Sequence, residues 1–292
     1  MSPATLEVHL ILLLGQICFA SLPVVGRLAM QGGHIPPAGI VIVRMIGGAI
    51  VFSLIALRRG VLRVERADIW KLVGCALLGV AANQELFIQG LARSTATNAS
   101  VLGATIPVFT VLVAMVMRRE PVRARRLVGI GIAFAGAAAL VGVDRMSTSP
   151  EHVLGSVLIL LNSLAYGTFL VVVRSLSAKY DPIGLLAVLF LIGVPMVAPF
   201  GIAAWAEAPS PTAGDVAFLA FLVAVPTVGA YALVQNALRR AEATLVAAYI
   251  YLQPVFASIG AVLLLHETMT PRMIGCGMIV LSGVWYAARS RP

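Results

Sequence analysis

The chain has 292 residues, of which 60% are hydrophobic and 11% are charged, and its mean hydropathy is +0.99. Soluble globular domains carry about 25% charged residues. A chain with less than half of that charge cannot cover a water-soluble surface. The composition therefore excludes a soluble globular protein and predicts an all-α membrane protein.

The remaining totals exclude several other classes. The net charge of +9 does not indicate nucleic-acid binding, because the basic residues lie in short gaps between apolar runs. The three cysteines are scattered inside apolar runs, and the four histidines are isolated near the ends of runs. No G-x-x-x-x-G-K-[ST] motif is present, so a phosphate cradle for ATP is missing. We expect no metal, no cofactor and no enzymatic activity.

Ten apolar runs approach the length at which a helix crosses the hydrocarbon core, which takes about 20 residues. Period-2 alternation is absent, which argues against a β-barrel. The first run lacks a positive leading segment and is long enough to span, so we treat it as a retained helix. The runs lie near residues 8–30, 37–57, 69–91, 96–117, 126–143, 153–173, 183–205, 215–237, 243–265 and 272–288.

The basic residues between the runs predict the orientation. Of the 21 Lys and Arg residues, 16 fall on the side that carries the N-terminus, four fall on the other side, and Arg44 lies within a run. Cytoplasmic loops carry an excess of Lys and Arg. We therefore expect a multi-pass protein of the cell inner membrane with both termini in the cytoplasm.

The two halves of the chain match when the sequence is moved against itself by 147 positions. Each copy holds five runs, an odd number, so the second copy must cross the membrane in the opposite orientation. We expect two inverted five-helix repeats, residues 1–146 and 147–292, forming one transport unit around a central cavity, as in secondary transporters; a passive scaffold is the alternative. Chance similarity between apolar sequences does not readily align Arg, Pro and Glu. At this offset, however, Arg93, Pro107 and Glu120 align with Arg240, Pro254 and Glu267.

With these motifs the chain resembles the EamA-type ten-helix exporters of the drug/metabolite transporter superfamily. The resemblance covers nearly the whole chain and is most specific in the fourth and ninth runs. There, an Ala-Thr start and a mid-run proline are followed by Glu120 or Glu267 and then Arg-x-x-Gly. The resemblance implies export of amino acids, other metabolites or drugs without ATP. Among the members of this family, the aromatic amino-acid exporters resemble the chain most.

Arg44 is a candidate for substrate binding. It lies about two turns into its run, where a charged side chain costs about 2.5–3.5 kcal/mol on insertion scales. A guanidinium can bind a substrate carboxylate through two parallel hydrogen bonds. The alternatives are an anchor near the headgroups of the outer face and a rigid structural pair.

Glu85 is the only carboxylate well inside a run, and its position in the second copy holds Ala232. A buried carboxyl could bind a proton or a substrate ammonium. The alternative is an ion pair with Arg44 or Arg93.

Other polar and aromatic residues lie near the centres of runs rather than at their ends, where interfacial aromatic belts form. They predict a cavity with aromatic walls and a few hydrogen-bonding groups. The further candidates are Gln16, Phe19, Gln84, Asn162, Tyr166, Tyr231, Gln235, Tyr249, Tyr251 and Gln253.

Pro107 and Pro254 are candidate hinges. Each removes one helical hydrogen bond, and the freed carbonyls of Gly103 and Ile250 could face the cavity. A proline in a membrane helix can also be a packing feature only.

These observations predict a secondary transporter that exports small metabolites by alternating access, with amino acids that are aromatic or large and apolar as the expected substrates. Its partners are the substrate and the lipid bilayer, with no nucleic acid, and we expect a functional monomer. The alternatives are export of other metabolites or drugs, exchange of phosphometabolites or nucleotide sugars, a channel, and an intramembrane enzyme. Exchange of phosphorylated anions needs several basic residues at the midplane, where only Arg44 lies.

Overall fold

The computed structural model describes residues 3–94, 99, 102–119, 124–141, 150–256, 259 and 271–288. Within these residues every regular element is a helix. Six helical segments of 23 to 28 residues are long and apolar enough to cross a bilayer. Three shorter apolar helices span Ile106–Val116, Ala243–Phe256 and Ile274–Ala287. With α7, these segments represent all ten expected spans and confirm the ten-helix membrane fold.

The spans follow one another in the order of the apolar runs. The first five are α1 (Pro3–Gln31), α2 (Pro37–Arg59), a segment of η1 (Arg66–Asp68), α3 (Ile69–Ala76), η2 (Leu77–Ala81) and α4 (Ala82–Ala92), then α6 (Ile106–Val116) and α7 (Ala124–Val141). The second five are α8 (Pro150–Ser177), α9 (Pro182–Glu207), a segment of α10 (Ala213–Val223), η4 (Ala224–Gly229) and α11 (Ala230–Leu238), then α12 (Ala243–Ala248) with η5 (Tyr249–Tyr251), and α14 (Pro271–Ala288).

Several helix ends follow from local sequence. Asp181 begins α9 by accepting hydrogen bonds from the backbone of Ile183 and Gly184. Thr212 and Asp215 form a reciprocal capping box at the start of α10. Gly60 ends α2 at φ 65°, a left-handed conformation that glycine adopts without a Cβ clash. These caps satisfy orphan backbone groups and fix where the spans begin and end.

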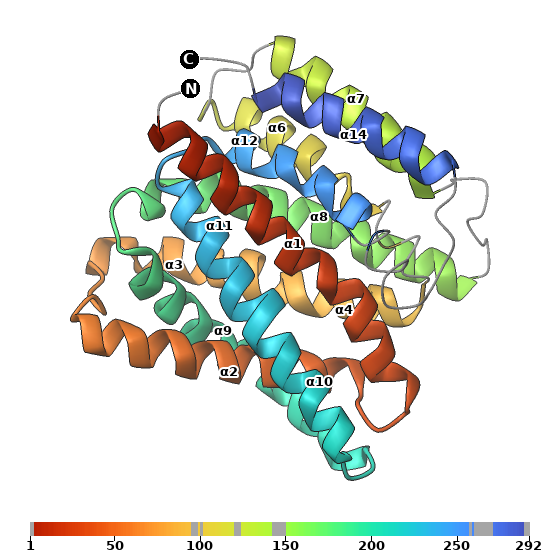
Figure 1. Cartoon of the computed structure of the whole chain (residues 1–292). Coiled ribbons are helices and arrows are strands. Elements are labelled where there is room, and N and C mark those ends of the chain that lie inside the picture. The colour runs from red at the N-terminus through yellow and green to blue at the C-terminus, as the bar shows by residue number, and fades with distance from the viewer. Residues whose placement is uncertain are drawn as a thin grey trace.

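Equivalent helices of the two halves run in opposite directions (Figure 1). α1 and α8 are antiparallel, and α2 packs along α9 while α7 packs along α14. We call the end of the bundle at which α1 begins and α14 ends the terminal face, and the opposite end the distal face. The predicted boundary between residues 146 and 147, together with Glu120 and Glu267, lies outside the described residues.

One arginine contact is repeated in both halves and shows the inversion in detail. Arg27 Nη1 donates to the carbonyl oxygens of Leu91 and Ser94, at 3.1 and 2.8 Å. Arg174 Nε donates to the carbonyl oxygen of Ala241 at 3.1 Å. Ser94 and Ala241 are 147 residues apart, as are Arg27 and Arg174. A cation thus meets carbonyls beyond a helix C-terminus in each copy, at the distal face in one and the terminal face in the other.

A wide π turn interrupts the third and eighth spans at the same register. η2 and η4 begin at Leu77 and Ala224, which are 147 residues apart. A π turn holds one extra residue, and such turns are frequent at functional sites. In the third span, buried residues recur at every fourth position: Leu72, Ala76, Val80, Gln84 and Ile88. In a regular α-helix, with 3.6 residues per turn, residues at this spacing would drift around the helix axis. The wider π turn offsets most of that drift.

A side chain donates a hydrogen bond to a backbone carbonyl at each π turn. The carbonyl oxygen of Gly79 accepts from Tyr231 Oη at 3.0 Å. The carbonyl oxygen of Leu222, just before η4, accepts from Thr227 Oγ1 at 2.7 Å. Side chains therefore bond carbonyls that the altered helical pattern leaves available, and the Gly79 contact joins the two halves.

Deleting Leu77, whose side chain is exposed, should remove the π turn without rotating residues 82–92, because the turn is an α-helix with one residue added. We expect a folded protein that loses about 1–2 kcal/mol, the value of the buried Tyr231 hydrogen bond. Deleting the equally exposed Ile50 from the regular helix α2 is the control. It rotates the rest of α2 by about 100° and should cost more than about 4 kcal/mol. Thermal unfolding in detergent measures both, and equal losses would contradict the prediction.

Candidate functional site

A pocket lies between the two halves, with walls from both. Its volume is about 80 Å³. The lining residues are Phe19, Leu22, Pro23, Arg44, Asn83, Gln84, Phe87, Ala99, Gly103, Ala104, Ile106, Asn162, Tyr166, Tyr231, Ile250, Gln253 and Pro254.

The pocket brings together part of the expected set of site residues. Seven of the twelve expected side chains line it: Phe19, Arg44, Gln84, Asn162, Tyr166, Tyr231 and Gln253. The other five, Gln16, Glu85, Gln235, Tyr249 and Tyr251, are not among the lining residues.

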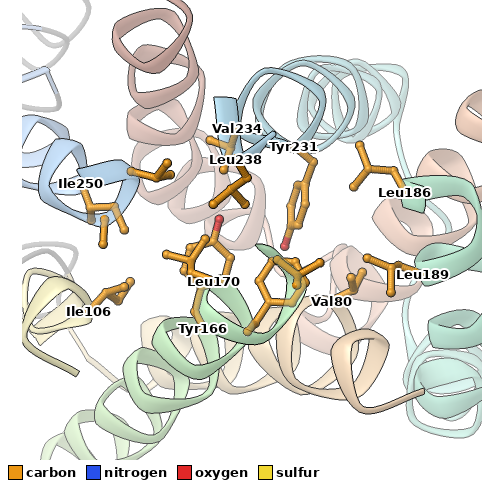
Figure 2. Close-up of a cluster of buried hydrophobic side chains, with 14 of the residues drawn as sticks. Val80, Ile106, Tyr166, Leu170, Leu186, Leu189, Tyr231, Val234, Leu238 and Ile250 are labelled. Carbon is orange, nitrogen blue, oxygen red and sulfur yellow. The ribbon is translucent and has the colours of Figure 1, made fainter. Parts of the chain in front are cut away.

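An aromatic wall forms where α1, α8 and α11 meet. The ring of Phe19 packs edge-on against Tyr231 and Tyr166, with centroids 5.5 and 6.5 Å apart. Figure 2 shows Tyr166 and Tyr231 approaching from opposite sides with their hydroxyl groups toward the middle of the cluster. Both tyrosines are buried. The expected aromatic cavity is therefore present, and its polar atoms are phenol hydroxyls held inside an apolar cluster.

Arg44 is buried, with 1% of its surface exposed. Its Nε donates to Thr227 Oγ1 at 2.8 Å, and Thr227 is held in turn by the carbonyl oxygen of Leu222. Arg44 Nη1 is buried and has no hydrogen-bond partner, and no described carboxylate forms an ion pair with the guanidinium. This burial is incompatible with an anchor at the headgroups, and Thr227 is the structural partner that the sequence analysis did not identify.

Gln84 occupies the position equivalent to Tyr231 in the other half and is also buried. Its Nε2 lies 3.2 Å from the sulfur of Met45, a weak acceptor. Its Oε1 is buried and has no partner. The side chains that line the pocket therefore include one with an unpaired acceptor oxygen and one with an unpaired guanidinium nitrogen.

A chain of amide contacts completes the polar wall. Asn162 Nδ2 donates to the carbonyl oxygen of Asn83 at 2.7 Å, and Tyr231 Oη lies 3.3 Å from Asn83 Oδ1. Asn83 was not among the expected site residues. Its signal in the sequence was its place beside Gln84 in a run with several amides, which could not reveal which of them faces inward.

Four of the five expected residues outside the pocket have other hydrogen-bond partners. Gln16 Oε1 accepts from the pocket residue Gln253 at 2.7 Å. Gln235 donates to Ser177 at 2.5 Å, and Tyr249 is hydrogen-bonded to His9. Tyr251 is fully buried, and its hydroxyl has no partner.

Glu85 is joined to Arg93 through an intermediate amide. Its Oε1 accepts from Gln89 Nε2 at 2.8 Å, and Gln89 Oε1 accepts from Arg93 Nη1 at 2.6 Å. Among the described ion pairs, Glu85 forms none with Arg44 or Arg93; it reaches Arg93 only through Gln89, and its Oε2 is buried without a partner. Binding of a proton or an ammonium by Glu85 stays a prediction.

The two candidate hinge prolines follow helix irregularities. Thr105 lies in a turn immediately before α6, which places Pro107 in the first turn of that helix. Pro254 comes three residues after the 3₁₀ turn η5. Gly103 and Ile250 line the pocket, as expected for the carbonyl-bearing residues, and Pro254 lines it while Pro107 does not. Whether the prolines act as hinges stays a prediction.

A layer of contacts joins the helices at the terminal face. Arg126 pairs with Glu242 and donates to Thr244 at 2.6 Å, which ties α7 to the start of α12. Arg240 pairs with Glu7 at 2.7 Å. The pocket residues of α1 and of the ninth span come after His9 and Tyr249 in the chain, farther from this face. The pocket therefore lies on the distal side of the contact layer.

Lys179 adds a second connection at the terminal face. Its Nζ lies 2.7 Å from Asp68 and 2.6 Å from Glu65. These carboxylates, with Asp68 the larger contributor, raise the pKa of Lys179 above its usual value.

Among the described residues no group of three His, Cys, Asp or Glu side chains could hold a metal ion.

The EamA-like transporter family matches the chain twice, over residues 7–142 and 153–289, so the chain belongs to this family. It is a multi-pass membrane transporter with the same domain in each half. A protein of known crystal structure has the same fold, with a TM-score of 0.80 at 18% identity over 96% of each chain.

Two curated relatives carry related descriptions. An uncharacterized transporter of Archaeoglobus fulgidus is 27% identical over 96% of each chain. A "Probable terminal-alkyne amino-acid exporter" of Streptantibioticus cattleyicolor is 25% identical over 85% of this chain and 82% of its own.

Proposed function

We propose that this chain is a secondary transporter that exports small metabolites by alternating access. Amino acids with aromatic or large apolar side chains are the proposed substrates. The observation that carries the proposal is the pocket between two inverted copies, with an aromatic wall and buried hydrogen-bonding groups from both. Two antiparallel copies can form a site that opens to either side of a membrane in turn. The proposal involves no catalytic step and no cofactor.

The chemistry of the pocket supports amino acids over phosphorylated anions. Phosphate recognition uses several basic groups, and Arg44 is the one Lys or Arg among the lining residues. The distant relative named as an amino-acid exporter agrees with this choice. Export of other metabolites or drugs is the second candidate, favoured by the mostly apolar lining.

The charge distribution supports an inner-membrane location with the terminal face in the cytoplasm. Arg58 and Arg59 end α2 at this face, and Lys179 and Arg240 lie in loops there. Within the described part of the chain, residues of both halves of one molecule line the pocket, which supports a functional monomer.

Flux from reconstituted vesicles tests the proposal. Proteoliposomes loaded with radiolabelled threonine, methionine, phenylalanine or tryptophan should release phenylalanine, tryptophan or methionine faster than protein-free liposomes, with a rate that saturates. A rate that rises linearly to high concentration would indicate a channel. Retention of all four compounds would refute the proposed substrates, and an outward pH gradient applied to Glu85→Gln and the native protein would separate passive from proton-coupled export.

A further inference from the structure

Two side chains that line the pocket each carry an unpaired polar atom, and the two atoms are of opposite character. Arg44 Nη1 is a cationic donor, and Gln84 Oε1 is a neutral acceptor; both are buried without a partner. Their side chains are 1% and 2% exposed, and both line the pocket. Buried polar atoms in folded proteins nearly always have partners, so two exceptions on side chains that line one cavity suggest a ligand that supplies both.

The ligand chemistry follows from the two atoms. A buried guanidinium with no carboxylate nearby is costly in the membrane interior and is best satisfied by an anion that accepts directed hydrogen bonds. An amide oxygen without a donor is satisfied by an N–H group, and an ammonium offers three. A molecule with a carboxylate and an ammonium close together supplies one partner to each atom.

Thr227 sets which edge of the guanidinium is available. Its Oγ1 accepts from Arg44 Nε at 2.8 Å and donates to the carbonyl oxygen of Leu222 at 2.7 Å. Because the Thr227 hydroxyl occupies Nε, the Nη1 atom is left for another acceptor. The equivalent residue in the first copy is Val80, and Arg44 corresponds to Leu191. This arrangement therefore exists once in the molecule, on one side of a pseudo-symmetric pocket.

We propose that Arg44 Nη1 and Gln84 Oε1 form a subsite for the α-carboxylate and α-ammonium groups of a free amino acid. The inference rests on the proposed transport function and narrows its substrate to compounds with both groups unmodified. Arg44 and Gln84 contact the substrate, and Thr227 is a positioning residue that acts through Arg44.

Binding to the purified protein tests the subsite with two series of probes. Phenylalanine is compared with phenethylamine, which lacks the carboxylate, and with 3-phenylpropionate, which lacks the amine. Leucine is compared with isoamylamine and 4-methylpentanoate in the same way. By isothermal titration calorimetry we expect each truncated probe to bind about 10- to 100-fold more weakly than its amino acid, the value of one charge-assisted hydrogen bond.

Two variants assign each preference to one residue. Arg44→Gln should bind phenylalanine and phenethylamine equally while still discriminating against 3-phenylpropionate. Gln84→Leu should show the reverse pattern. Gln89→Leu is the matched control, because Gln89 lies on the same helix outside the pocket lining, and it should keep both preferences.

Thr227→Val should weaken the preference for the carboxylate, and Thr227→Ser should restore it, which a loss of packing alone would not do. Arg44→Lys keeps the charge without the planar fork and should retain part of the preference if Arg44→Gln does not fold.

The outcomes separate this inference from transport itself. If phenethylamine or 3-phenylpropionate binds the native protein as tightly as phenylalanine, and the leucine series agrees, the corresponding half of the subsite is wrong. If no probe of either series binds, the subsite is wrong as a whole. In both cases the flux assay reads the transport function independently, because it also includes threonine, methionine and tryptophan.

Discussion

Glu242→Ala is expected to shift the protein toward a state that is open at the terminal face. Glu242 is the carboxylate partner of Arg126, whose side chain is 7% exposed. Removing one partner of a buried pair leaves an uncompensated charge, which opening of the face relieves by hydration. Since Glu242 itself is 24% exposed, solvent screening reduces the effect to about 1–3 kcal/mol, or about 5- to 150-fold in the equilibrium.

The labelling rate of a cysteine at Ser177 measures this shift. Ser177 is fully buried beside Gln235 on the terminal side, so a maleimide reagent reaches a cysteine there only when the layer opens. Cys18, Cys75 and Cys276 are replaced by alanine in every background. We expect faster labelling of the Glu242→Ala variant in vesicles that expose the terminal face.

Arg240→Ala is the matched control for the Glu242 prediction. The Arg240–Glu7 pair is at the same face, but its side chains are 45% and 55% exposed. Exposed pairs contribute about 0–1 kcal/mol, so labelling should rise less than about 5-fold. Equal acceleration by both variants would show that the buried pair does not hold the face closed.

Gly129→Val should cost about 3 kcal/mol of stability, the upper end of the usual overpacking penalty. A Cβ at Gly129 would lie 2.6 Å from the backbone nitrogen of Ala287 in α14. A backbone atom cannot move aside as a flexible side chain can, so α7 and α14 must separate. Thermal unfolding in detergent and the fraction of monodisperse protein measure the loss.

Gly131→Val is the control for this prediction. Gly131 is on the same helix two residues away, and a Cβ there meets no atom within 4 Å. Its cost should stay within about 0.5 kcal/mol. A similar loss in both variants would mean that glycine matters in α7 for its backbone flexibility and not for the approach of α14.

The spans and the duplication could be predicted because both leave direct traces in the sequence. A bilayer demands long apolar helices. Arg27 and Arg174, which match at the offset of 147, each donate to an equivalent backbone carbonyl, that of Ser94 or Ala241. The aromatic part of the candidate pocket could also be predicted, because its residues are visible in the sequence. Phe19, Tyr166 and Tyr231 are bulky and central in their spans, and they meet in one wall.

The remaining features of the site depend on how each helix is rotated about its axis and on contacts between helices, which composition does not encode. Gln235 and Tyr249 are as polar as Gln84, but they lie nearer the terminal face and pair with Ser177 and His9. Thr227 was missed because a threonine in an apolar run is common, and its importance comes from the guanidinium of another helix. The two π turns were missed as well, since hydropathy does not distinguish a five-residue turn from a four-residue one.

The paired π turns also record the history of the molecule. One residue inserted into an α-helix can be accommodated as a π turn, which leaves the helix beyond it in its original orientation. An insertion at the same place in both copies, η2 and η4, requires one such event if it preceded the gene duplication and two if it followed. The shared position of the two π turns therefore takes fewer events to explain if the widened helix preceded the duplication.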